Sequence, residues 1–371
     1  MPDRFVELAQ ASKSSQVDAA GLEAALRAQI RGGSPGDIRF DAGARALYST
    51  DGSNYRQVPI GIVLPRDVDD VLTTVALCRQ FGAPLLCRGG ATSLAGQCCN
   101  VAIVLDFTKY MSRIVEIDPA RRVARVQPGV VLDNLRNAAE KHHLTFGPDP
   151  ASHDRCTLGG MIGNNSCGVH SVMAGKTDDN IEELDILTYD GVRLKVGQNF
   201  IHDHAGTGGP ELSGRADSER ATQLRESLKQ IAAQYADLIR QKFPSIPRRV
   251  SGYNLNFLLP ENGFHVARAL VGSEGTCVTV LEATCRLVES PPERVLLVVA
   301  YPDIFQCADQ VPEIMAHKPM ALRASTIFSS ATPRPRGLIP KGSRCCPKAA
   351  AGSWQNSELR PRPKPKLKLA R

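Results

Sequence analysis

Apolar and polar positions along this chain recur with two periods, one typical of strands and one of helices. Short apolar runs bounded by Pro, Gly or charged residues predict buried strands over 60–64, 85–87, 101–106, 183–188, 192–195 and 278–288. Apolar and polar residues alternate on both sides of Asp118-Pro119, which predicts a hairpin over 114–126. Apolar residues at helical spacing predict helices over 22–30, 68–81, 131–142 and 223–243. Strands and helices interleaved in this way predict an α+β fold.

Composition along the chain suggests four parts. Residues 1–55 read as a helical lead-in, 56–290 as the main folded domain, and 291–322 as the start of a further domain that is incomplete. Within the main domain, 201–220 reads as a polar, mobile insert, and 267–276 as a strand followed by a turn. A new strand is expected over 295–301. Residues 323–371 contain seven prolines and no apolar period, so we expect a disordered tail.

Overall composition indicates a globular chain with a substantial core. Of 371 residues, 42% are hydrophobic and only 5% aromatic, which favours packing of small and branched side chains. No apolar run approaches the roughly 18 residues of a membrane span. The charged start, Met1 to Arg4, is not typical of a secretory signal, and the 11 cysteines show no disulfide or metal-ligand spacing. We therefore expect reduced thiols and a cytoplasmic protein.

The net charge of +7 comes entirely from the tail. Residues 323–371 hold 12 Lys and Arg against one acid, Glu358, so the remaining residues carry 33 basic and 37 acidic side chains. A nucleic-acid interface would have to use that tail, which lacks interleaved aromatic residues and regular spacing. We therefore expect no nucleic-acid partner.

Two glycine-rich segments carry the candidate chemistry. Arg88 to Gly96 follows the strand 85–87, and its glycines and small side chains let the backbone approach a ligand closely. Consecutive N–H groups without helix or sheet partners form an anion-binding nest. A second glycine-rich segment, 156–168, can supply donors from the other side, as a diphosphate requires. The first segment runs into another strand rather than a helix, so a Rossmann NAD site is not expected.

Four blocks in order resemble the FAD-binding domain of the vanillyl-alcohol oxidase/p-cresol methylhydroxylase (PCMH-type) superfamily. They are Tyr55–Pro59, Arg88–Gln97, the segment 146–152 followed by 157–168, and Gly272–Thr276. The branch most similar to them comprises the D-lactate and D-2-hydroxyglutarate dehydrogenase-like flavoproteins. Ala91 departs from the pattern, because many members have a third glycine there, but a methyl group is a small intrusion and we expect binding to survive it.

The resemblance implies a PCMH-type domain of two α/β subdomains that binds FAD noncovalently. The implied cofactor-binding residues are Arg88, Gly89, Gly90, Ala91, Thr92, Ser93, Leu94, Ala95, Gly96, Pro148, Asp149, Thr157, Gly159, Gly160, Gly163, Asn164, Asn165, Ser166, Gly168, Glu274 and Gly275. Among these, Arg88 could either add charge near the diphosphate or form a surface salt bridge. Asn164 and Asn165 could bind the flavin rim or serve as left-handed turn residues.

The implied reaction is hydride transfer to the flavin from a 2-hydroxy acid such as D-lactate, glycolate or D-2-hydroxyglutarate. In the family the substrate carboxylate, the base and a metal site involve a cap domain and a segment beyond it, for which this sequence offers no counterpart. We therefore assign no catalytic and no metal-binding residues, and expect a truncated or frameshifted chain. The alternative is an inactive FAD-binding fragment. The sequence specifies neither the electron acceptor nor the oligomeric state.

Overall fold

The computed structural model describes residues 17–30, 37–203 and 215–324. The chain divides into two compact units, which we describe separately. One unit comprises residues up to Arg294 together with Pro319–Leu322, and the other contains Val295–Lys318. The predicted disorder of 323–371 concerns residues that lie, from 325 onwards, outside the described part. No described helix combines the length and apolar character needed to cross a membrane.

The first sheet of the larger unit has four strands in the order β1-β2-β4-β3. Its strands are β1 (Ile38–Arg39), β2 (Gly61–Val63), β3 (Leu85–Arg88) and β4 (Ile103–Asp106). β2 and β3 both run parallel to β4, and helix α4 (Val68–Gln80) connects β2 to β3. Asp67 caps α4 by accepting the N–H of Asp70. This arrangement places the glycine-rich segment directly after the carboxyl end of β3.

The lead-in differs from the expected helical segment by one short strand. Its helices are α2 (Ala19–Gln29) and α3 (Ala42–Leu47), and between them β1 pairs antiparallel with β2. Ile38 is buried, and the ring of Phe40 occupies the space where Gly61 lacks a side chain. Two residues are too few to show an alternating pattern, so the strand could not be read from the sequence.

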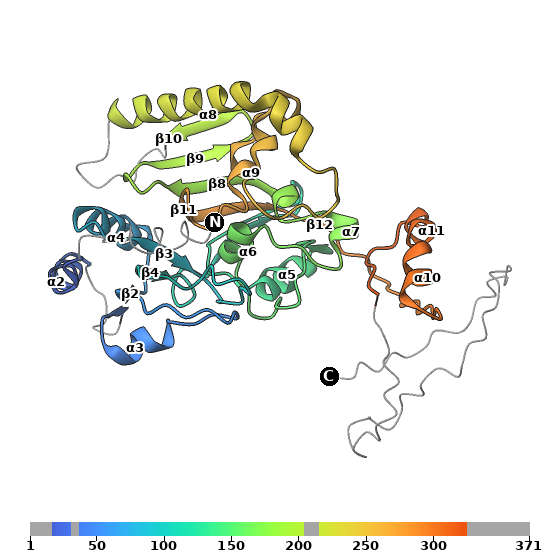
Figure 1. The fold of residues 1–371 in the computed structure, drawn as a ribbon, viewed down its shortest axis with the longest axis horizontal. Helices are drawn as coiled ribbons and strands as arrows, with labels where there is room; N and C mark the ends of the chain where they lie inside the picture. The colour runs from blue at the N-terminus through green and yellow to red at the C-terminus, as the bar shows by residue number, and fades with distance from the viewer. Residues whose placement is uncertain (1–16, 31–36, 204–214, 325–371) are drawn as a thin grey trace, which may run out of the picture. The chain divides into compact units, whose positions relative to one another are not determined.

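The second sheet has six antiparallel strands in the order β10-β9-β8-β11-β6-β5 (Figure 1). They are β5 (Ile114–Asp118), β6 (Val123–Val126), β8 (Ile181–Leu187), β9 (Arg193–Gly197), β10 (Phe200–Asp203) and β11 (Thr279–Arg286). Alternate residues such as Leu184, Leu194 and Ala283 point into the main core. Leu187 and Leu281 join the core of the four-stranded sheet instead, so the two sheets share packing.

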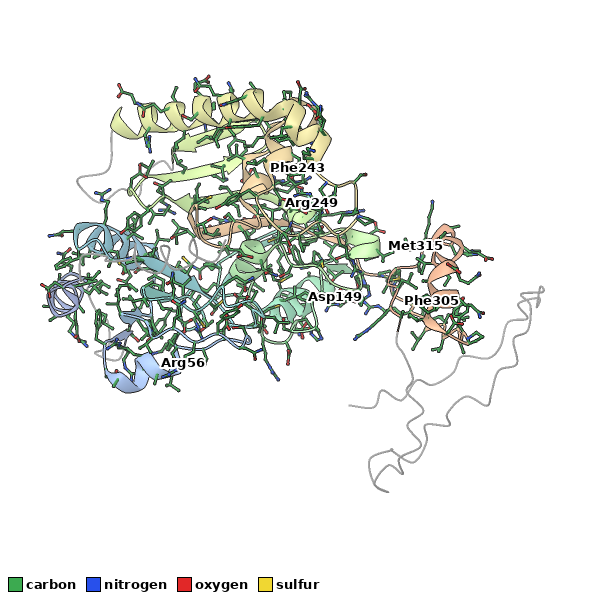
Figure 2. The ribbon with its side chains drawn as sticks, in the orientation of Figure 1. Arg56, Asp149, Phe243, Arg249, Phe305 and Met315 are labelled. Atoms are coloured by element: carbon green, nitrogen blue, oxygen red, sulfur yellow. The ribbon has the colours of Figure 1, made fainter. Side chains whose placement is uncertain are left out.

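The remaining elements of the larger unit surround these sheets. They are α5 (Leu132–Glu140), β7 (Leu144–Thr145), α6 (Leu158–Asn164), α7 (Ser171–Ala174), η2 (Asp178–Asn180), α8 (Arg215–Lys242), η3 (Leu255–Leu258), η4 (Pro260–Asn262), α9 (Val266–Leu270) and β12 (Val288–Glu289). The long helix α8 contacts β10 and η3. In Figure 2, Arg249 lies beside Phe243, and its guanidinium carbon is 4.6 Å from the ring centroid.

One sequence prediction is wrong in this region, and a second is contradicted only at the two ends of its segment. Residues 267–270, expected as a strand, belong to helix α9, which Val271 ends in an extended conformation, and Val266 and Ala267 are buried on its inner side. The insert 201–220 includes the end of strand β10 and the start of helix α8, while 204–214 lie outside the described residues.

The smaller unit contains the third difference. Val295–Ala300 has no regular structure where a strand was expected, and Val295–Val298 are each at least 69% exposed. A strand needs a hydrogen-bonding partner, and the described residues pair none with this segment. Two short helices follow, α10 (Ile304–Asp309) and α11 (Val311–Ala316). Their apolar residues Phe305 and Met315 are 78% and 38% exposed (Figure 2).

Candidate functional site

Three glycine-rich segments of the sequence line a cavity of about 850 Å³. From here on, Arg88–Gln97 is called the first block, 156–168 the second block and Gly272–Thr276 the third block. The wall of the cavity is formed by residues within 87–98 at and after the end of β3, within 150–157 leading into α6, within α6 itself, and within 270–280 up to the start of β11. Figure 1 shows α6 between the levels of the two sheets. The volume falls in the range of about 300–1,000 Å³ that is typical of small-molecule and cofactor sites.

The first block exposes a row of backbone donors. Within the described part of the chain, the N–H groups of residues 89–94 donate to no acceptor, whereas the N–H of Ala95 binds the side-chain oxygen of Gln97 at 3.2 Å. The block approaches the second block closely: a side chain at Gly89 would overlap the Thr157 hydroxyl, and one at Gly90 the Arg155 carbonyl. Glycine is therefore required at both positions for the two segments to meet.

Ala91 stands in the left-handed region, with a φ of 52°. Its carbonyl accepts the N–H of Gly52 at 3.0 Å, which holds the turn in place. An alanine in this conformation costs about 1 kcal/mol relative to glycine. We expect Ala91→Gly to raise the free energy of unfolding by up to about 1 kcal/mol. Denaturant unfolding of the two proteins measures this, and a lower stability of the variant would contradict the inferred strain.

The guanidinium of Arg88 forms no surface salt bridge among the described residues, and its expected charge near the diphosphate stays a prediction. Its nitrogens donate to the carbonyl oxygens of Thr50 at 2.7 Å, Cys98 at 2.9 Å and Tyr48 at 3.2 Å. It also lies over the Tyr48 ring, 5.1 Å from the centroid. Among the described residues Arg88 contacts no carboxylate, so we interpret it as a side chain that fixes the two ends of the first block through backbone carbonyls.

The second block contains a helix where the sequence suggested a loop. Thr157 caps α6 by accepting the N–H of Gly160 at 3.3 Å, and Asn165 ends it in the left-handed conformation, with a φ of 52°. A side chain at Gly159 would meet Pro128 at 2.7 Å. Leu158, Met161 and Ile162 are buried in the core. This packing offsets the low helix propensity of three glycines.

The third block is tied to α6 by its main chain. The N–H of Gly272 binds the Ile162 carbonyl at 2.8 Å, and that of Glu274 binds the Gly163 carbonyl at 3.0 Å. The amide of Gln97 donates to the Glu274 carboxylate at 3.2 Å, which links the first block to the third. Sequence reasoning missed Gln97 as a site residue. Its place at the end of the first block was the available signal.

Most of the residues expected to bind the cofactor line this cavity. They are Arg88, Gly89, Gly90, Ala91, Thr92, Ser93, Leu94, Ala95, Thr157, Gly159, Gly160, Gly163, Asn164, Ser166, Glu274 and Gly275. Further lining residues that the sequence did not single out are Cys87, Gln97, Cys98, Ser152, Asp154, Arg155, Leu270, Ser273, Val278 and Val280, among others. The apolar residues Leu270, Val278 and Val280 form the part of the wall next to β11.

Five expected residues lie outside the lining: Gly96, Pro148, Asp149, Asn165 and Gly168. Asp149 accepts two hydrogen bonds from His170, from its N–H at 2.9 Å and its Nδ1 at 2.5 Å. A side chain at Gly168 would overlap Asp149. Asn165 is fully buried and binds Asp178. These residues support the walls of the cavity from behind.

Comparison with known proteins finds one matching family and several similar proteins. Residues 59–197 match the family described as FAD binding domain. D-2-hydroxyglutarate dehydrogenase of Pseudomonas putida is 33% identical over 301 residues, which are 80% of this chain and 29% of that protein. The glycolate oxidase subunit GlcD of Bacillus subtilis is 28% identical over 277 residues, 74% of this chain and 47% of that protein. The chain thus spans less than a third of the first relative and less than half of the second.

Solved structures support the same fold. A structure of alkyldihydroxyacetonephosphate synthase has a TM-score of 0.53 and 17% sequence identity, and the match covers 81% of this chain and 50% of that one. A second structure of the same synthase has a TM-score of 0.54. Residues 59–197 thus match the FAD-binding domain family and have its fold, and the chain is similar to the D-2-hydroxyglutarate dehydrogenase and glycolate oxidase flavoproteins.

Proposed function

We propose that the cavity binds one FAD noncovalently and that the protein oxidises a 2-hydroxy acid of the D-lactate, glycolate or D-2-hydroxyglutarate type. One observation carries this proposal: three glycine blocks far apart in the sequence meet at one cavity, where the N–H groups of residues 89–94 have no acceptor among the described residues. Backbone donors without acceptors are suited to a diphosphate.

The lining residues fit the rest of a flavin dinucleotide. The backbone of the first block and the hydroxyl of Thr92 would hold the diphosphate, and the apolar side chains of Leu270, Val278 and Val280 would contact the rings. Burial raises the pKa of Cys87 and of Cys98 to about 11, so both thiols stay protonated at neutral pH. A protonated thiol is a poor nucleophile, which supports noncovalent binding.

When bound, FAD supplies the hydride acceptor for the oxidation of the substrate carbon. The walls of the cavity would exclude water from the ring and hold it in place. The described cysteines are all unpaired thiols, which supports a reducing compartment such as the cytoplasm.

Binding of FAD without turnover is the second candidate. Among the described residues, the cavity wall contains no His, Tyr or Lys, and its carboxylates belong to Asp154 and Glu274. Glu274 is hydrogen-bonded to Gln97, and Asp154 lies 3.4 Å from Arg155, so no obvious base faces the cavity. Because the Arg88 guanidinium donates to backbone carbonyls, Arg155 is the remaining lining cation for a substrate carboxylate. We assign no catalytic residue.

The test separates binding from chemistry. Purified protein should show the visible absorption of flavin, or should quench the fluorescence of added FAD at stoichiometric concentration. Reduction of an artificial dye should then be measured with D-lactate, glycolate and D-2-hydroxyglutarate. Dye reduction with one of these acids supports the dehydrogenase, and FAD uptake without reduction supports the second candidate. Folded protein that takes up no FAD would overturn both.

A further inference from the structure

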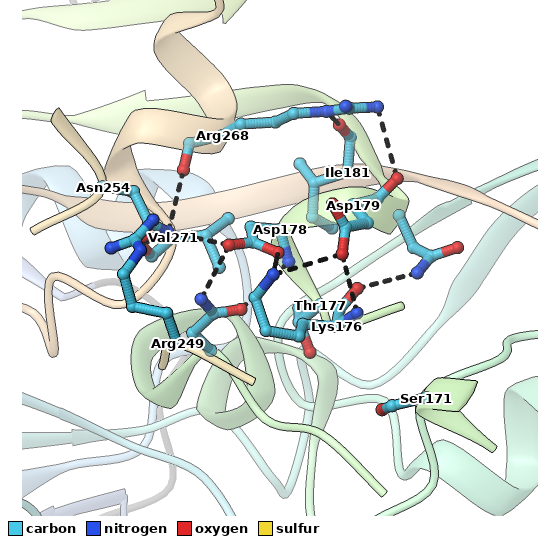
Figure 3. A network of polar contacts seen from close by, with 12 residues as sticks. Ser171, Lys176, Thr177, Asp178, Asp179, Ile181, Arg249, Asn254, Arg268 and Val271 are labelled. Atoms are coloured by element: carbon cyan, nitrogen blue, oxygen red, sulfur yellow. Dashed lines mark hydrogen bonds and ion pairs between the residues drawn. The ribbon is translucent and has the colours of Figure 1, made fainter. Parts of the chain in front are cut away.

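The carboxylate of Asp178 is fully buried outside the cavity, where segments distant in the sequence meet (Figure 3). Its Oδ2 accepts a hydrogen bond from the side-chain amide of Asn165 at 2.8 Å and another from that of Asn254 at 3.1 Å. The Asn165 side-chain oxygen in turn accepts the backbone N–H of Asp178 at 3.1 Å. One carboxylate therefore ties two side chains that lie 89 residues apart in the sequence.

Each of these two asparagines is connected to a segment that lines the proposed FAD site. Asn165 ends helix α6, and Ser166, which follows it, lines the cavity. The Asn254 amide also donates to the carbonyl of Val271 at 2.9 Å, and Val271 immediately precedes the third block. The third block is bound back to α6 through the Gly272 N–H. Asp178 thus completes a closed ring of contacts between the second block and the third.

Basic side chains and a second carboxylate surround the buried carboxylate of Asp178. The Lys176 ammonium lies 3.1 Å from Oδ1 and 3.3 Å from the Asp179 carboxylate. Arg249 contributes further positive charge, and Arg268 donates to the Asp179 carbonyl at 3.2 Å (Figure 3). Burial is the largest effect on Asp178 and raises its pKa, and the Asp179 charge acts in the same direction.

A buried group of charged side chains such as this one contributes little to the stability of a protein core. Well-packed apolar residues often replace a buried ion pair without loss of stability. We therefore explain the carboxylate buried between the second and third blocks by its effect on their relative position rather than by a contribution to stability. Its two amide contacts fix the position of α6 relative to the third block, and both of these segments line the cavity.

We propose that Asp178 is a positioning residue for FAD, which holds the third block against α6 and so fixes the cavity wall formed by Ser273, Glu274 and Gly275. This inference rests on the proposed FAD site. It assigns a binding role to a side chain that does not itself reach the cavity.

Asp178→Asn tests the inference, with Asp179→Asn as the matched control. Both variants lose one negative charge at neighbouring positions, but the Asp179 side chain is 37% exposed and bonded to Lys176 rather than to either asparagine. FAD affinity should be measured by fluorescence titration of the full-length apoprotein, and stability by denaturant unfolding of the same samples. We expect Asp178→Asn to weaken FAD binding about tenfold or more, and Asp179→Asn to change it by less than about twofold.

A purely structural role predicts a different result. If Asp178→Asn lowers apoprotein stability but binds FAD as tightly as the parent, the inference is wrong while the FAD site stands. Should this variant fail to fold, Asn254→Ala provides the second test, because it removes the link to Val271 and leaves the Asn165 contact. Unchanged FAD affinity in that variant would also overturn the inference. A parent protein that takes up no FAD overturns the proposed function as well.

Discussion

Gly163→Val is expected to abolish most FAD binding while the apoprotein still folds. Gly163 lies in α6 on the cavity wall, and the nearest heavy atom to an added Cβ is the Glu274 Cα at 3.8 Å. A Cβ there makes ordinary contact with Glu274 without a clash, and because Gly163 lines the cavity, a larger side chain would take up cavity space. We expect Gly163→Ala to weaken FAD binding about tenfold and Gly163→Val about a hundredfold, since a larger side chain fills more of the cofactor space. Titration of each apoprotein with FAD measures the series.

The apoprotein controls make this prediction specific. Alanine favours a helix over glycine by about 1 kcal/mol, so Gly163→Ala should leave unfolding stability unchanged or raised. Gly43→Ala in α3, where an added Cβ would lie 3.3 Å from the Asp41 carboxylate, serves as a helical glycine outside the cavity. Its FAD affinity should equal that of the parent. A Gly163→Val protein that is stable and binds FAD normally would place the cofactor elsewhere.

The glycine blocks show how far the sequence predicts this site. Gly89 and Gly90 could be identified from the sequence because only glycine permits the close approach to Thr157 and Arg155. The residue type alone therefore indicates that the backbone makes a close contact at these positions. The sequence likewise predicted the strands that pair as β5–β6 and β8–β9, because their apolar runs are bounded by turn residues. These features depend on local chemistry, which a single sequence contains.

Other features depend on contacts that a single sequence does not contain. Helix α6 forms because Leu158, Met161 and Ile162 reach the core and Gly159 fits against Pro128, although local propensity favours a loop. The Tyr48 and Thr50 carbonyls that bind Arg88, and the Asn254 amide that binds Asp178, come from segments far away along the chain. The apolar run at Val295 predicted a strand, but a strand also needs a partner.

Asp37→Ala is expected to destabilise the larger unit by about 2–3 kcal/mol, which corresponds to a fall of about 5–10 °C in Tm. The Asp37 side chain is 3% exposed and joins the lead-in to the four-stranded sheet. It accepts hydrogen bonds from Arg66 at 2.8 Å, Lys109 at 3.0 Å and the Tyr110 hydroxyl at 2.9 Å. Glu289→Ala is the control, since the Arg122–Glu289 ion pair is exposed on both sides and should contribute little.

The same carboxylate should make stability depend on pH in the acid range. Burial opposes ionisation of Asp37, but the hydrogen bonds from Arg66, Lys109 and Tyr110 outweigh it and lower the pKa from 3.8 to about 2. Because the folded pKa lies below the unfolded one, Asp37 stabilises the fold above about pH 4, and this contribution of about 2 kcal/mol is lost as the pH falls towards 2. Unfolding free energies of the parent and Asp37→Ala should therefore converge between pH 4 and pH 2. A constant difference across that range would show that the ionised carboxylate is not what stabilises the lead-in.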